Sequence, residues 1–252
     1  MTGQNRAARR IAVVAAAAAL AALAPQVWAQ AGATAPSQSH TAHGLAALWV
    51  ALTHSGGPPK APEPVRWPLV FALTSWVAWF ASWIAAAFWS KRAEARAQRS
   101  AEWVYSVLVY AGFALLVLPT LRANYGPRLW NPPEAVKWAV AALVPLGFGL
   151  AWWARIHLGR DWSWNVRRKE DHRLVDTGPY AVVRHPIYTG ILLASVATAV
   201  LEAKWPSFAG LALLTLGLWL KASLEERFLS RELGAIAYGD YVARTGRLLP
   251  RL

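Results

Sequence analysis

Five apolar stretches restrict this chain to a membrane fold. The clearest one, Trp67 to Ser90, contains no charged residue and has Trp near both ends. The other four are residues 103–121, 135–154, 187–201 and 207–220. A helix needs about 20 apolar residues to cross a bilayer, because its backbone polar groups must be satisfied within the segment. We therefore predict an all-α integral membrane protein with about five transmembrane helices.

The last two predicted spans are each short for a full crossing. Only residues 202–206 separate them, and this segment contains Pro206. The spacing predicts a C-terminal helical hairpin, whose second arm continues through 221–231 as a charged helix. In the preceding span, Pro145 and the pair Gly147 and Gly149 predict a kink or a close helix contact.

The N-terminal region has the pattern of a targeting segment. Arg6, Arg9 and Arg10 precede an apolar run, and small residues follow it, so we predict that residues 1–31 are a signal peptide or an uncleaved anchor. Residues 32–66 are rich in Pro, Gly, Ser and Ala and predict a linker. Three His residues in a linker of this composition are more often plain polar residues than ligands, so no metal site is predicted.

The basic residues indicate how the chain is oriented in the membrane. The formal net charge is +13, which could suggest a nucleic-acid partner. Most Lys and Arg residues instead fall in segments beside apolar runs, as the positive-inside rule predicts. We therefore expect membrane lipids and no nucleic acid as partners, and we place residues 155–186 and 221–252 on the cytoplasmic face. The oligomeric state stays open. The chain has no Cys, which excludes thiol nucleophiles and disulfides.

One polar stretch stands at the start of the fourth predicted span. Gly178 and Pro179 predict a turn, and Arg184 places a permanent cation beside His185, the side chain type that titrates near neutral pH. Pro186 follows, and Pro is well tolerated in the first turn of a helix. We interpret this stretch as a polar site at the mouth of a transmembrane helix.

A second polar region follows the fifth predicted span. Residue types alone favour a solvated helix face for Glu225 and Glu226, with Arg227 and Arg231 as neighbours. The predicted topology puts this region on the same face as Arg184, so the two regions can meet. The sequence has no P-loop motif and no complete dinucleotide-binding glycine motif. A nucleotide-like cofactor would therefore be bound by something other than a Rossmann domain.

An ordered series of motifs resembles a known family. The motifs are Leu158–Val166, His172–Val175, Thr177–Gly190, Leu224–Phe228, Tyr238–Tyr241 and Leu248–Pro250. Together they resemble the isoprenylcysteine carboxyl methyltransferase family, and phospholipid N-methyltransferases share much of the C-terminal pattern. The resemblance covers residues 135–252, expected to form the methyltransferase-like domain. Residues 67–134 are expected to form two N-terminal membrane spans.

The resemblance implies an S-adenosylmethionine-dependent methyltransferase with a cytoplasmic cofactor site. The acceptor would be lipophilic and would come from the bilayer, as a carboxylate, a thiol or a lipid headgroup. The implied catalytic residues are Arg184, His185 and Glu225. The implied cofactor-binding residues are His172, Gly178, Pro179, Tyr180, Arg184, His185, Pro186, Tyr188, Gly190, Glu225 and Glu226.

Two alternatives remain at this point. Sterol-type membrane reductases carry a related Arg-His-Pro-x-Tyr pattern and bind NADPH, and a non-catalytic membrane scaffold could keep the hairpin alone. The signal-like N-terminus suggests a bacterial protein, which would lie in the inner membrane.

Overall fold

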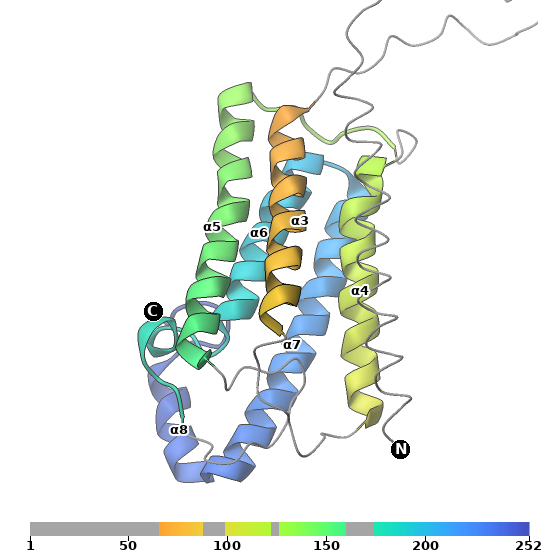
Figure 1. The fold of residues 1–252 in the computed structure, drawn as a ribbon. Helices are drawn as coiled ribbons and strands as arrows, with labels where there is room; N and C mark the ends of the chain where they lie inside the picture. The colour runs from red at the N-terminus through yellow and green to blue at the C-terminus, as the bar shows by residue number, and fades with distance from the viewer. Residues whose placement is uncertain (1–65, 88–98, 122–125, 160–173, 252) are drawn as a thin grey trace, which may run out of the picture. The chain divides into compact units, whose positions relative to one another are not determined.

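The computed structural model describes residues 66–87, 99–121, 126–159 and 174–251 (Figure 1). The described residues from Pro68 onward belong to one compact unit, residues 68–252. The predicted signal segment and nearly all of the linker lie outside the described residues. The described elements are α3 (Trp67–Ala87), α4 (Arg99–Leu121), α5 (Glu134–Leu158), the 3₁₀ turn η2 (Gly178–Ala181), α6 (Pro186–Glu202), α7 (Trp205–Leu233) and α8 (Ala235–Arg244).

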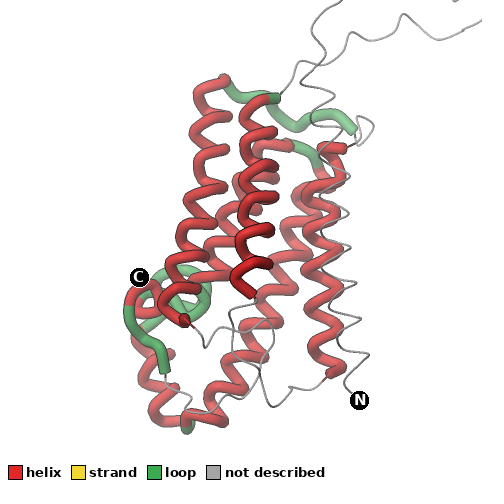
Figure 2. Tube along the Cα trace, viewed as in Figure 1, coloured by secondary structure: helices red, strands yellow, loops and turns green. Residues whose placement is uncertain are grey.

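Helices account for all the regular elements in the described part of the chain, as Figure 2 shows. Three of them are long and apolar enough to cross a membrane: Trp67–Ala86 within α3, then α5 and α7. The apolar part of α4, Glu102–Val117, and the whole of α6 are shorter. The all-α membrane fold is thus confirmed at this level, and the count of about five crossings stays a prediction.

The predicted C-terminal hairpin is confirmed. α6 ends at Glu202, and Ala203 adopts a left-handed conformation with φ of 53°. α7 begins at Trp205, with Pro206 in its first turn, and continues through the charged segment to Leu233. The two arms are therefore antiparallel, so that the start of α6 and the last turns of α7 lie at the same end. We call this the α8 end, because it also carries η2 and α8 (Figure 1).

Glycines permit two close helix contacts. A Cβ on Gly147 of α5 would lie 2.4 Å from the carbonyl oxygen of Gly190 in α6. At the α4–α7 contact, a Cβ on Gly112 would lie 2.7 Å from the carbonyl oxygen of Gly210. Backbones can approach this closely only where side chains are absent. The close contact predicted near Gly147 is thus confirmed, whereas Gly149 faces open space.

Helix α3 packs by aromatic side chains. The Trp76 ring lies 4.8 Å from that of Phe148 in α5 and 5.0 Å from that of Phe113 in α4. The Trp79 ring stacks on Phe148 at 4.9 Å. The indole N–H of Trp76 also donates to Thr198 Oγ1 of α6 at 3.0 Å. This helix therefore joins the α5–α6 pair to α4 through bulky rings.

The glycine contact yields a stability prediction with an internal control. Gly190→Ala should lower the thermal midpoint of the detergent-purified protein, because its Cβ would meet backbone atoms that cannot move freely. Overpacking of this kind costs about 1–3 kcal/mol. Gly149→Ala adds the same methyl group into open space and should be neutral or slightly stabilising. Equal midpoints for the two variants would contradict the contact.

Candidate functional site

The Arg-His-Pro loop pairs with the C-terminal segment, which we define as residues 245–248. Val183 and Gly246 form an isolated parallel bridge. The backbone N–H of Arg184 donates to the Gly246 carbonyl at 2.8 Å, and that of His185 donates to the Arg247 carbonyl at 3.1 Å. His185 then caps α6, and Pro186 begins it, as the sequence predicts. Backbone hydrogen bonds to the C-terminal segment therefore fix the Arg-His-Pro loop.

Glu226 of α7 joins these two segments. Its carboxylate accepts from Arg184 Nε at 2.8 Å and from His185 Nε2 at 3.2 Å. It also pairs with the guanidinium of Arg247. Glu226 is buried, with 9% of its surface exposed. The interpretation of this position as a solvated helix face is therefore wrong, because three cationic groups surround the carboxylate.

Glu225 pairs on the other side of the same imidazole. It accepts from the Tyr188 hydroxyl at 2.6 Å, and its Oε2 lies 3.4 Å from His185 Nδ1. The His185 ring stacks on the Tyr188 ring at 5.3 Å with an interplanar angle of 4°. Each imidazole nitrogen therefore faces a carboxylate, and only the doubly protonated ring can donate to both.

The electrostatics of His185 agree with this geometry. Burial alone lowers the pKa of His185, but hydrogen bonds to Glu225 and Glu226 and the charges of both carboxylates raise it. The net effect is a pKa above the ordinary value of 6.5. The protonated form of His185 is therefore favoured, and the protonated ring has no free nitrogen to accept a proton.

The structure brings five predicted site residues into one cluster: Arg184, His185, Tyr188, Glu225 and Glu226. Arg184 is occupied within it, because its Nη1 also donates to the carbonyls of Val242 and Thr245. The remaining predicted positions build its surroundings. Pro179 and Tyr180 of η2 are buried, and the Tyr180 carbonyl accepts from the Tyr241 hydroxyl at 2.8 Å.

Two predicted glycines are explained by packing. Gly178 has a φ of 58°, and a Cβ there would lie 2.3 Å from Nε2 of His157. Gly190 forms the α5 contact described above. His172 lies outside the described residues.

Two residues of the cluster were not among the predicted catalytic or cofactor-binding positions. Arg247 lies over the Trp219 ring at 4.4 Å and donates to Ser223 Oγ at 3.1 Å. Lys221 Nζ lies 5.3 Å from the centre of the Tyr188 ring. Lys221 precedes Glu225 by one helical turn, and this i, i+4 spacing could have revealed it. Arg247 directly precedes the Leu248–Pro250 motif, and this position beside the family pattern is its signal in the sequence.

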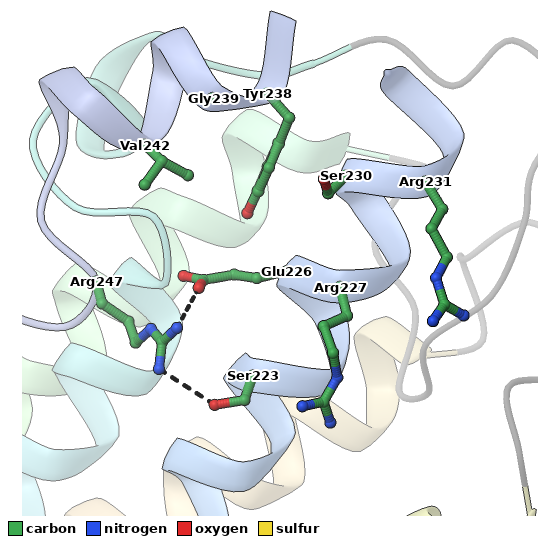
Figure 3. A pocket seen from close by; sticks show the side chains of 9 residues that line it. All are labelled: Ser223, Glu226, Arg227, Ser230, Arg231, Tyr238, Gly239, Val242 and Arg247. Carbon is green, nitrogen blue, oxygen red and sulfur yellow. Dashed lines mark hydrogen bonds and ion pairs between the residues drawn. The ribbon is translucent and has the colours of Figure 1, made fainter. Parts of the chain in front are cut away.

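A cavity of about 550 Å³ lies between α7 and α8 and borders this cluster (Figure 3). Its lining is mostly hydrogen-bond donors. The lining residues are Ser223, Glu226, Arg227, Ser230, Arg231, Tyr238, Gly239, Val242 and Arg247. Among the predicted site residues that the structure describes, Glu226 alone lines the cavity, together with Arg247 of the cluster.

The fold and the cluster define an α-helical membrane protein with a buried ionic site at one end of its helices. Residues 140–231 match the model of the isoprenylcysteine carboxyl methyltransferase (ICMT) family. The match lies within residues 135–252, where the motifs resemble this family, so that resemblance is confirmed. Over 102 residues the chain is 31% identical to protein-S-isoprenylcysteine O-methyltransferase B of Arabidopsis thaliana. The match covers 38% of this chain and 52% of that protein, so the chain spans about half the length of the relative.

The charged state of His185 predicts a pH dependence of stability. Because its pKa is raised in the folded protein, the imidazolium contributes its full stabilisation below about pH 6.5, and the contribution is lost as pH rises through the raised pKa. As the pH rises above about 6.5, the thermal midpoint of the wild type should therefore fall more steeply than that of His185→Gln. His157→Gln, at a position beside Gly178, should keep the wild-type slope. Parallel slopes for wild type and His185→Gln would contradict the ionic pairing.

Proposed function

We propose that this protein transfers a methyl group from S-adenosylmethionine to a lipophilic acceptor at the cytoplasmic face of the membrane. The observation that carries the proposal is the Glu226 cluster, which joins two of the family's motif segments and Arg247 beside an open cavity. Its position at the α8 end agrees with the basic residues of that end, which favour the cytoplasmic side.

The cavity lining suits the proposed cofactor. The Tyr238 ring can attract a sulfonium, since cations bind to aromatic faces. The hydroxyl of Ser230 can donate a hydrogen bond to the cofactor's carboxylate. These residues would hold S-adenosylmethionine, which supplies an already activated methyl group. The protein's remaining tasks are to align the acceptor and to exclude water.

The cluster also favours one class of acceptor. A thiol or an ammonium must lose a proton before it can attack, and this step needs a general base. His185 donates from both nitrogens, and Glu225 already accepts from Tyr188. An acceptor that is already anionic, such as a lipophilic carboxylate, needs no base. We therefore favour a carboxylate over a thiol or a headgroup amine.

Ligand binding tests the proposal. Radiolabelled S-adenosylmethionine should bind saturably to the detergent-purified protein, and NADPH in parallel should not. Glu226→Gln should weaken binding about tenfold or more, because the neutral amide cannot balance the cations around it. Arg244→Gln removes an exposed charge that pairs with Asp176, also at the α8 end. This variant should bind S-adenosylmethionine like the wild type.

A second variant guards against loss of fold. Ser230→Trp fills the cavity without altering the Glu226 pairs, so it should abolish binding while the thermal midpoint stays near that of the wild type. Saturable binding of NADPH alone would reject the methyltransferase and favour the reductase alternative. Unchanged S-adenosylmethionine binding in Ser230→Trp would place the cofactor elsewhere.

A further inference from the structure

Two arginines at the rim of the cavity are unused by the ionic cluster. Arg227 and Arg231 are one helical turn apart on α7, are both exposed and line the cavity. Figure 3 shows the two side chains extending from the same side of the helix. Within the described part of the chain, neither guanidinium makes a hydrogen bond or an ion pair. This contrasts with Arg184 and Arg247, whose donors are engaged.

The charge around these arginines favours an anion. Glu226 is the carboxylate that lines the cavity, and Arg184, His185 and Arg247 already balance it. The C-terminal end of α7 carries roughly half a negative charge from its helix dipole, which two full guanidinium charges outweigh. Ser230 and Tyr238 add hydroxyl groups to the lining.

The depth of the arginines matches the lipid headgroup layer. Trp205 begins α7 and is 72% exposed, as expected for a residue at a membrane interface. Arg227 follows it by 22 residues, or about 33 Å along a helix that rises about 1.5 Å per residue. The hydrocarbon core is about 30 Å thick. Arg227 therefore lies just beyond the opposite edge of the core, where the phosphates of the other leaflet lie.

We propose that Arg227 and Arg231 form a binding site for the phosphate of a membrane lipid headgroup. Guanidinium groups match the oxygens of a phosphate and can donate two parallel hydrogen bonds each. The lipid would lie at the mouth of the cavity, with its chains along the apolar part of α7. The site goes beyond the proposed function and does not depend on methyl transfer.

Binding of short-chain lipids to the detergent-purified full chain tests this site. Dioctanoyl phosphatidylglycerol should bind saturably. Dioctanoylglycerol has the same chains and lacks the phosphate, so its affinity should be lower by about tenfold or more. The double variant Arg227→Gln with Arg231→Gln should lose affinity for the phosphatidylglycerol by a similar factor. Arg244→Gln removes an exposed guanidinium from α8, and this variant should bind phosphatidylglycerol like the wild type.

Three results would overturn the site. Unchanged phosphatidylglycerol binding in the double variant would exclude the two arginines. Inorganic phosphate or octanoate binding as tightly as the phosphatidylglycerol would mean a general anion site with no preference for a lipid phosphate. A loss of S-adenosylmethionine binding with lipid binding intact would assign the arginines to the cofactor. If S-adenosylmethionine fails to bind the wild type while the lipid results hold, only the proposed methyl transfer fails.

Discussion

The site depends on one buried carboxylate and its three cationic partners. Removing a carboxylate from water costs several kcal/mol unless charge and hydrogen bonds replace the solvent. Glu226 obtains them from Arg184 and His185 before α6 and from Arg247 after α8. The family match ends at residue 231, yet Arg247 lies beyond it and completes the balance. The C-terminal segment is therefore part of the site, since without Arg247 the cluster would lose one of its cations.

The helix hairpin explains how these residues meet. His185 stands just before α6, and Glu226 lies in the last turns of α7, so the two are far apart along the chain and level along the antiparallel arms. The glycine contacts set the spacing of the helices around them. Gly190 lets α6 approach α5, and Gly210 lets α7 approach α4. The packing of the membrane-spanning helices thus positions the ionic cluster, which lies at the α8 end of these helices.

Much of the fold could be predicted from the sequence, because apolar length and Pro or Gly placement act locally. The hairpin turn at Ala203, the helix start at Pro186 and the close contact at Gly147 are examples. The pairing of Glu226 could not be predicted, since its partners lie 21 to 42 residues away. Charge runs are usually solvated, so residue type alone favoured the wrong environment for Glu226. Arg184 was expected to be available for a ligand, whereas its donors are used inside the protein.

The most direct measurement is amide hydrogen exchange in Glu226→Gln compared with the wild type. In the wild type, Glu226 pairs with both the Arg-His-Pro loop and the C-terminal segment and holds them together. The amides of Arg184, His185 and Gly246, which bond across these segments, should then lose protection together in the variant, while the α4–α7 contact near Gly112 keeps its protection. Unchanged protection at these three amides would contradict the account.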